Sequence, residues 1–517
     1  MTFEIVFVLL SLLGMVAALI ADKMRPGMIL FSVVVLFLCA GILTPKEMLE
    51  GFSNKGMITV ALLFLVSEGI RQSGTLGQVI KKLLPQGKTT VFKAQLRILP
   101  SVAFISAFLN NTPVVVIFAP IIKHWAKSVN LPATKFLIPL SYVTILGGIC
   151  TLIGTSTNLV VHGMILEAGF EGFSMFELGK VGIFIAIAGI IYIFLFSKRL
   201  LPDARPDTAV PDEEVEEGEK LHRVEAVLGA RFPGINKKLK DFNFQRHYGA
   251  EVKEIKTRNG QRFVSNLEDV LLHEGDTLVV MADDTFIPTW GESSVFVLLT
   301  NGNEPDTTGK KKRWFALLLL VLMIVGATVG ELPITKEMFP GIKLDMFFFV
   351  SITTIIMAWT NLFPARKYTK YISWDILITI ACAFAISKAM VNSGVADSVA
   401  KFIIGLSDDY GPHVLLAMLF IITNLFTELI TNNAAAALAF PLALSIASQL
   451  GVSPTPFFVV ICMAASASFS TPIGYQTNLI VQGIGNYKFT DFVRIGLPLN
   501  IITFLISIIL IPLIWNF

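Results

Sequence analysis

The most informative pattern in this chain is the alternation of long apolar runs with polar stretches. The first set of runs lies at about 2–20, 27–43, 57–70, 98–122, 136–166 and 176–197, and the second at about 314–330, 344–363, 372–404, 413–450, 456–484 and 492–516. Runs of this kind are typical of helices that cross a bilayer, where lipid is the solvent. The pattern predicts an all-α polytopic membrane protein, with a small α+β domain inserted between two membrane halves.

Composition agrees with this class. Of the 517 residues, 54% are hydrophobic and 15% are charged, and the mean hydropathy is +0.70. A soluble fold of this length could not bury so much apolar surface. A net charge of +3 is too small to indicate a nucleic-acid partner. We therefore expect the lipid bilayer as a partner, and the cell membrane (inner or plasma membrane) as the location.

Shifts in composition divide the chain into four segments. Residues 1–200 form an N-terminal membrane repeat, and residues 310–517 form a C-terminal inverted repeat. Residues 201–220 are rich in Asp and Glu and predict an acidic linker. Residues 221–309 alternate in polarity as short strands do, and they predict a soluble domain.

The basic residues indicate how the chain is oriented, since Lys and Arg gather on the cytoplasmic side of short loops. Basic residues follow several runs and flank the soluble segment. They can all be cytoplasmic only if the runs at 98–122 and 413–450 each enter and leave on the same side. We expect two re-entrant hairpins with tips at Asn110-Asn111 and Asn432-Asn433, both termini outside, and a cytoplasmic soluble domain.

Three polar motifs recur in the same order in both halves. The motif from Ser67 to Gly74 matches the one from Ser387 to Gly394, and the motif that begins at Gly154 matches the one at Gly474, each 320 positions later. The paired asparagines match 322 positions apart. An odd number of spans separates the partners, so the halves should be inverted, as in many secondary transporters. A duplication without transport is the alternative.

Each half also places small polar residues where a lipid-facing helix would be apolar, at 147–158 and at 466–478. Both segments predict helices that unwind inside the membrane. Non-helical backbone is tolerated there only where protein or a wet cavity satisfies it. The exposed helix N-termini would favour an anion, and exposed carbonyl oxygens would suit sodium. The alternative is that these residues only mediate helix packing.

Glu428 is an ionisable residue within an apolar run, which makes it a functional candidate. It lies one turn before the second tip and, by the shift of 322, aligns with Ser106. It could supply a carboxylate to a cation or carry a proton in its place. The alternative is a carboxylate that only accepts hydrogen bonds from the hairpin backbone.

Four of these motifs resemble the divalent-anion:sodium symporter family. They are Asn110 to Pro113, Gly147 to Thr155, Thr431 to Ala434 and Thr471 to Asn478. The resemblance covers most of both membrane halves and is strongest to a sulfate-permease-like branch that carries inserted domains. It implies a homodimer, a moving transport domain and an elevator-type mechanism.

The resemblance also implies two sets of site residues. The substrate set is Asn110, Asn111, Thr112, Thr155, Ser156, Asn432, Asn433, Ala434, Thr471 and Pro472. The sodium set is Ser106, Asn110, Asn111, Gly154, Glu428, Asn432, Asn433 and Ser470. The family's tips carry a Ser-Asn-Thr signature, but the second tip here is matched as Asn432-Asn433-Ala434. Ala434 has no hydroxyl, which favours a compact oxyanion over a diacid.

The preferred hypothesis is therefore a sodium-coupled symporter of a divalent inorganic anion, with sulfate favoured. A sodium-coupled di- or tricarboxylate symporter is the alternative within transport, and an ion channel or sensor is the alternative of another class. The sequence shows no nucleotide-binding glycine loop, catalytic triad or metal-ligand cluster, so we do not expect an enzyme. No covalent cofactor is expected; sodium is the expected coupling ion, and protons are the alternative.

The inserted segment resembles the TrkA-C type of regulatory domain. The matching features are the tract from Arg231 to Leu239, Tyr248-Gly249 and the ending from Leu271 to Leu278. The resemblance implies regulation or dimerisation, and a small-molecule or nucleotide ligand on this domain. A folded insertion without a ligand is the alternative.

Overall fold

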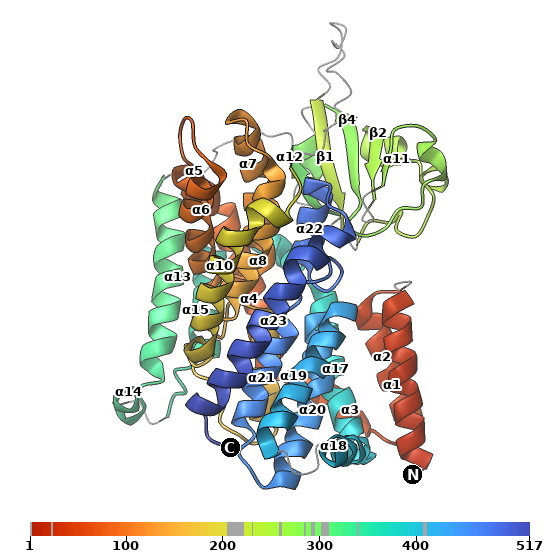
Figure 1. The fold of residues 1–517 in the computed structure, drawn as a ribbon, viewed down its shortest axis with the longest axis vertical. Coiled ribbons are helices and arrows are strands. Elements are labelled where there is room, and N and C mark those ends of the chain that lie inside the picture. Colours follow the sequence, from red (N-terminus) through yellow and green to blue (C-terminus); the bar gives the residue numbers. More distant parts are fainter. Residues whose placement is uncertain are drawn as a thin grey trace, which may run out of the picture.

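The computed structural model describes residues 3–21, 24–203, 222–229, 231–257, 261–283, 286–290, 295–300, 310–338, 341–406 and 411–517. Helices from both halves of the chain form one body, and a small sheet lies at one end of it (Figure 1). Both chain ends lie toward the opposite end of this body. The linker predicted at 201–220 falls outside the described residues, apart from residues 201–203.

Helices account for nearly all of the two membrane halves. Those of the first half are α1 (Phe3–Ala21), α2 (Pro26–Cys39), α3 (Pro45–Glu50), α4 (Lys55–Gln72), α5 (Thr75–Leu83), α6 (Val91–Ser106), α7 (Asn111–Ser128), α8 (Leu137–Gly148), α9 (Ser156–Glu167) and α10 (Gly179–Leu200). Those of the second half are α13 (Lys310–Gly330), α14 (Pro333–Met338), α15 (Met346–Trp359), α16 (Tyr368–Tyr371), α17 (Trp374–Asn392), α18 (Val395–Leu406), α19 (Gly411–Leu429), α20 (Asn432–Leu450), α21 (Thr455–Ser466), α22 (Gln476–Gly485) and α23 (Phe489–Ile514).

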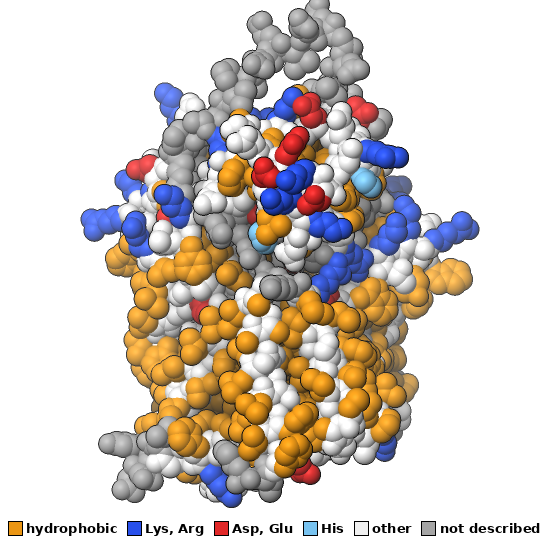
Figure 2. Space-filling view, turned by 90° about the vertical axis from the view of Figure 1, so that its right-hand side faces the viewer, with side chains coloured by type: hydrophobic (Ala, Val, Ile, Leu, Met, Phe, Trp, Pro, Cys, Tyr) orange, Lys and Arg blue, Asp and Glu red, His pale blue; other side chains and the backbone are white. Residues whose placement is uncertain are grey.

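The helical body has the surface of a membrane protein. Within the described residues, eight helical segments are long and apolar enough to cross a bilayer. Shorter apolar helices accompany them, including α2, α15 and α21. Figure 2 shows hydrophobic side chains covering the body below the sheet, while most Lys and Arg side chains on this face lie on or just beneath the sheet domain. The predicted polytopic membrane fold is confirmed.

The inserted segment folds as a small α+β unit. Its strands are β1 (His222–Leu228), β2 (Glu251–Lys256), β3 (Arg262–Phe263), β4 (Thr277–Ala282) and β5 (Phe296–Thr300), and its short helices are α11 (Phe244–Tyr248) and α12 (Phe286–Trp290). The strands pair antiparallel in the order β3-β2-β4-β1-β5. An aromatic cluster that includes Phe232, Phe244 and Tyr248 fills the core behind the sheet.

This unit is docked on the helical body rather than tethered beside it. Lys123 of α7 donates to both carboxylate oxygens of Glu225 on β1, over 3.0 and 2.9 Å. Lys256 of β2 lies 3.4 Å from the same carboxylate. Nearby, a Cβ added to Gly483 of α22 would lie only 2.6 Å from Thr277 Oγ1 on β4, so the backbone of α22 packs closely on the sheet. The docked surface therefore reaches both α7 and α22.

Replacing Glu225 should weaken this docking. In Glu225→Gln, Lys123 and Lys256 face each other without a carboxylate, at an expected cost of about 2–4 kcal/mol. Hydrogen–deuterium exchange should then rise in β1 and at the C-terminal end of α7. Glu251→Gln is the matched control, because Glu251 lies on the same sheet, is exposed and pairs with Lys253. Unchanged exchange in Glu225→Gln would show that the ion pair does not hold the domain.

The same ion pair predicts a pH dependence. Burial alone would raise the pKa of Glu225, but Lys123 and Lys256 lower it from 4.5 to about 2. Because the pKa in the folded state is depressed, this contribution to stability is complete at neutral pH and is lost as the pH falls from 4.5 towards 2. The difference in melting temperature between the wild type and Glu225→Gln should therefore be constant near neutral pH and shrink below about pH 4. A difference that persists at the acidic end would contradict the assignment.

Candidate functional site

Two hairpin tips, one in each half, are built in the same way. The first lies between α6 and α7, where Ser106 Oγ donates to Asn111 Oδ1 over 2.7 Å. The second lies between α19 and α20, where Thr427 Oγ1 donates to Asn432 Oδ1 over 2.8 Å. In both tips a hydroxyl at the end of one helix thus fixes the asparagine that begins the next. The four side chains are buried.

These contacts correct the register predicted from the sequence. The tips match 321 positions apart, because Asn111 corresponds to Asn432. The predicted match of Glu428 with Ser106 is therefore wrong, since Thr427 holds that place. The predicted match of Ala434 with Thr112 is also wrong. Asn433 is the counterpart of Thr112. The N-cap position of α20 is held by Thr431, which carries a hydroxyl.

In the first half the chain between α8 and α9 is not helical, and its polar backbone is satisfied by nearby side chains. Asn158 Nδ2 donates to the carbonyls of Gly148 and Thr151, over 3.4 and 2.8 Å. The Thr151 hydroxyl donates to the Ala107 carbonyl at the tip. Gly154 is required here, since a Cβ would lie 2.5 Å from the Gly148 oxygen. The break is thus fastened to its own hairpin.

The second half repeats this arrangement between α21 and α22. Asn478 Nδ2 donates to the carbonyls of Ser468 and Thr471, over 2.9 and 3.1 Å. The Thr471 hydroxyl donates to the Glu428 carbonyl over 3.0 Å. A Cβ on Gly474 would lie 2.1 Å from Ser468 Oγ. The four residues of this break lie 320 positions after their counterparts in the first break, and Glu428 lies 321 positions after Ala107.

Each tip also contacts the break of the opposite half. Thr112 Oγ1 lies 3.4 Å from Gln476 Oε1, and Ser156 Oγ lies 3.3 Å from Asn433 Oδ1. Tyr475 joins them more tightly, since its hydroxyl accepts a hydrogen bond from Asn111 Nδ2 over 2.6 Å and lies 3.0 Å from Thr155 Oγ1. Segments far apart in the sequence therefore form one site.

Four helices begin at this site. The N-caps of α7, α9, α20 and α22 are Asn110, Thr155, Thr431 and Tyr475, and none of these side chains makes a capping hydrogen bond. The first N–H groups of a helix have no partner within it and lie at the positive end of its dipole. Four such ends brought together favour an anion.

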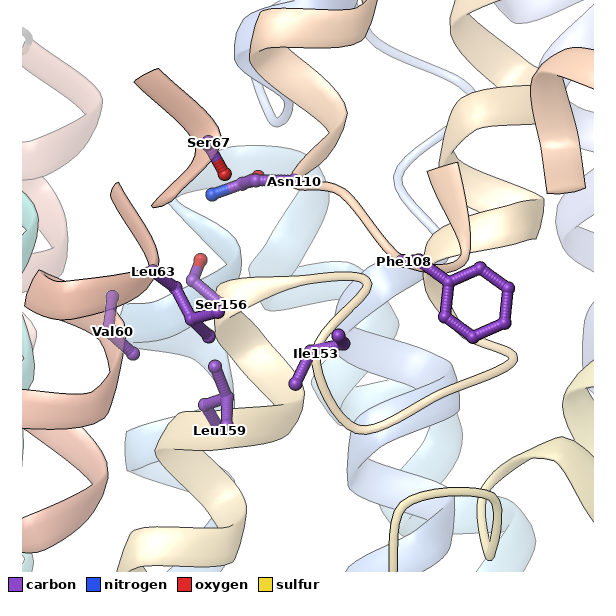
Figure 3. Close-up of a pocket in the computed structure, with 8 residues that line it drawn as sticks. All are labelled: Val60, Leu63, Ser67, Phe108, Asn110, Ile153, Ser156 and Leu159. Carbon is purple, nitrogen blue, oxygen red and sulfur yellow. The ribbon is translucent and has the colours of Figure 1, made fainter. Parts of the chain in front are cut away.

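A small pocket opens beside the first tip, between α4 and α9. It is lined by Val60, Leu63, Ser67, Phe108, Asn110, Ile153, Ser156 and Leu159. Figure 3 shows the Asn110 amide beside Ser67, with the Ser156 hydroxyl below them. Five of the eight lining residues are apolar and none is charged. An anion bound here would therefore meet the Asn110 amide, the Ser67 and Ser156 hydroxyls and the nearby helix ends.

The structure brings some of the predicted site residues together at the junction of the two halves and places the others in the supporting breaks and hairpins. Asn110, Asn111, Thr112, Thr155, Ser156, Asn432 and Asn433 lie at the tips and at the N-terminus of α9 where the halves meet. Gly154, Thr471 and Pro472 lie in the breaks, Ser106 fixes the first tip, and Ala434 is buried in the first turn of α20. Glu428 turns away from the tip, towards Ser470 and Asn500.

Several side chains of the site are absent from the predicted sets. Asn158 and Asn478 hold the breaks, Tyr475 and Gln476 reach across to the first tip, and Ser67 lines the pocket. Their positions within the repeated motifs were the available signal for Asn158, Asn478, Tyr475 and Gln476. Ser67 also begins a repeated motif, since Ser67 to Gly74 matches Ser387 to Gly394, but that match does not show that Ser67 lines the pocket.

Known proteins are similar to this chain over nearly its whole length. The family model described as citrate transporter matches residues 16–451 and 348–516. An uncharacterised transporter of Synechocystis is 30% identical over 94% of this chain and 93% of its own length, and one of Escherichia coli is 26% identical over 99% and 100%. Sodium/sulfate cotransporter 2 of Chlamydomonas reinhardtii is 31% identical over 54% of this chain and 31% of its own length.

Removing the hydroxyl that joins the two halves should lower stability. In Tyr475→Phe the buried Asn111 amide loses its acceptor, at an expected cost of about 1–3 kcal/mol. Thermal unfolding in detergent, followed by fluorescence, measures this as a lower melting temperature. Tyr368→Phe is the control, because Tyr368 is 50% exposed. Equal melting temperatures for Tyr475→Phe and the wild type would mean that this hydroxyl does not tie the halves together.

Proposed function

Because this chain belongs to the citrate and sulfate transporter family of the divalent-anion:sodium symporter type, we propose that it is a sodium-coupled symporter of a divalent inorganic anion. Sulfate is the favoured substrate. The observation that carries the proposal is the meeting of four uncapped helix N-termini, two at the hairpin tips and two at the breaks. Helix ends of this kind stabilise an anion without a fixed positive charge.

We assign the anion to the groups that face the junction of the halves. They are the tip residues Asn110, Thr112 and Asn433, together with Ser156 at the start of α9. Thr431, the N-cap residue of α20, offers a further hydroxyl at the second tip. Ser67 contributes a hydroxyl from α4, on the other side of the pocket. Amides and hydroxyls of this kind can donate to every oxygen of a tetrahedral anion.

We assign sodium to the places where a tip meets the break of its own half. Asn111 and Asn432 bring side-chain oxygens to these places, and the unwound backbone of the breaks brings carbonyl oxygens. Broken helices of secondary transporters commonly coordinate sodium in this way. There are two such places, one in each half. Two sodium ions bound there would balance both negative charges of a divalent anion.

In the sequence, the missing hydroxyl of Ala434 favoured sulfate, but the structure changes the residues of the second tip. The corrected register gives the second tip the hydroxyl of Thr431, so Ala434 no longer favours a compact oxyanion over a diacid. Sulfate is supported by the resemblance to a named sodium/sulfate cotransporter. A di- or tricarboxylate remains the second candidate, since the matching family model is described as citrate transporter.

We propose that the two halves are inverted repeats and that transport is of the elevator type. The hairpin α6–α7 and the hairpin α19–α20 approach the junction from opposite ends of the body (Figure 1). Helix α20 packs on α17, and its first turn is rich in buried alanines, which include Ala434, Ala435 and Ala436. Small side chains let the backbones of packed membrane helices approach closely.

Helices α4 and α9 also pack closely through small residues. A Cβ added to Gly56 of α4 would lie 3.0 Å from Gly163 Cα on α9, so these helices touch through their backbones. We propose that α2, α4, α15 and α17 belong to a fixed scaffold, and that α6–α10 and α19–α23 move against it. Assembly as a homodimer through the scaffold belongs to the same proposal.

For the inserted sheet domain we propose a cytoplasmic location and a regulatory role. Its docking on α7 and α22 supports this role, because both helices begin at the candidate site. A ligand that changed the docking would act directly on the moving helices. The TrkA-C resemblance suggests a small molecule or nucleotide as that ligand.

Uptake into proteoliposomes tests the proposed substrate. An inward sodium gradient should drive uptake of labelled sulfate, and excess unlabelled succinate should leave this uptake largely intact. Sodium-driven uptake of succinate that sulfate does not inhibit would overturn the choice of sulfate. Uptake that follows a proton gradient and ignores sodium would overturn the choice of coupling ion.

A point substitution tests the proposed site. Ser156→Ala removes one hydroxyl donor to the anion, and sulfate uptake at low concentration should fall about five- to tenfold. Ser11→Ala is the control, because the Ser11 hydroxyl bonds only to the Phe7 carbonyl within α1 among the described contacts. Equal uptake by both variants would place the anion elsewhere.

A further inference from the structure

The second half contains a polar cluster at membrane depth, formed by Glu428 of α19, Ser470 of the second break and Asn500 of α23. Glu428 Oε1 accepts hydrogen bonds from Ser470 N over 2.8 Å and from Asn500 Nδ2 over 2.7 Å. Asn500 Nδ2 also lies 2.9 Å from Ser470 Oγ. We call these three residues the Glu428 cluster.

Two oxygens of this cluster are buried without a partner. Glu428 Oε2 and Asn500 Oδ1 make no hydrogen bond within the part of the chain that the structure describes, and Asn500 is only 6% exposed. No Lys, Arg or His among the described residues forms an ion pair with Glu428. An unpaired carboxylate oxygen away from water is costly until a proton or a bound cation neutralises it, so the arrangement calls for one of these.

The first half has an equivalent place, which can be identified from close backbone contacts. A Cβ on Gly182 of α10 would lie 2.6 Å from the Ile149 oxygen, and one on Gly496 of α23 would lie 2.0 Å from the Phe469 oxygen. The two long helices therefore cross the two breaks at matching points. The next residue of each break is Cys150 in the first half and Ser470 in the second.

One turn beyond these glycines, Ala186 corresponds to Asn500. The register of the tips makes Ala107 the counterpart of Glu428. The first half thus carries Ala107, Cys150 and Ala186 where the second carries the Glu428 cluster. The first half forms the same hairpin and break with these apolar residues. The fold therefore does not require the polar residues of the Glu428 cluster.

We propose that the Glu428 cluster binds an additional sodium ion, which has no counterpart in the first half. Its ligands are Glu428 Oε2, Asn500 Oδ1 and Ser470 Oγ, three oxygens of the kind that hard cations prefer. The carboxylate balances the charge of the ion, and the ion satisfies both unpartnered oxygens. The inference extends the proposed function, because it makes the cation sites of the two halves unequal in number.

Sodium binding without substrate gives the first test. The melting temperature of the purified protein in detergent is measured against sodium concentration at constant ionic strength, with potassium as the replacement ion. Glu428→Gln keeps the shape and the Oε1 acceptor but removes the charge. Its melting temperature should depend less steeply on sodium, with about one ion fewer taken up on folding.

A second variant keeps the test decisive if Glu428→Gln does not fold. The triple variant Glu428→Ala, Ser470→Cys, Asn500→Ala gives the second half the residues that the first half already uses at this place. It should show the same loss of one sodium ion. Glu167→Gln is the control, because Glu167 lies at the far end of α9 and its carboxylate contacts Asn54. A sodium dependence identical to the wild type in either folded cluster variant would overturn the proposal.

Transport gives an independent readout where sulfate uptake is observed. The number of sodium ions moved per sulfate, taken from the reversal potential in proteoliposomes, should be one lower in the cluster variants than in Glu167→Gln. An unchanged ratio would overturn the additional site while leaving the symporter intact. If the wild type carries no sulfate, the proposed substrate fails, and the sodium titration still decides the cluster.

Discussion

The structure depends on the need to satisfy polar backbone that is not helical at the depth of the membrane. Asn158 and Asn478 meet this need by donating to carbonyls inside the two breaks. Thr151 and Thr471 then fasten each break to its hairpin. Because water and lipid cannot replace these bonds, the breaks stay in place only as part of the assembled core. That constraint brings four helix N-termini to one point.

Much of this could be predicted from the sequence, because polar residues stand out sharply in apolar runs. The predicted breaks at 147–158 and 466–478 contain the interruptions between α8 and α9 and between α21 and α22. The register of the tips could not be fixed in this way. Asn432 and Asn433 are identical neighbours, and only the hydrogen bond from Thr427 shows which of them corresponds to Asn111.

The contacts that complete the site are the ones that a single sequence hides. Tyr475 reaches Asn111 from a different half of the chain, and Asn500 reaches Glu428 from a separate helix. Each pairing depends on how helices pack, which local polarity does not encode. The same packing makes the two halves alike in their breaks and unlike around Glu428. The two halves thus share the hydrogen bonds of the central site and differ around Glu428, where we propose the additional sodium ion.

The most direct test of the account is whether a bound anion separates the tip of one half from the break of the other. In a variant without the native cysteines, Ser156→Cys and Asn433→Cys place two thiols at a junction now spanned by 3.3 Å between side-chain oxygens. A short bifunctional reagent should join them rapidly, and sulfate should slow the reaction when sodium is present but not when potassium replaces it. No cross-link, or a rate indifferent to sulfate and sodium, would contradict the account.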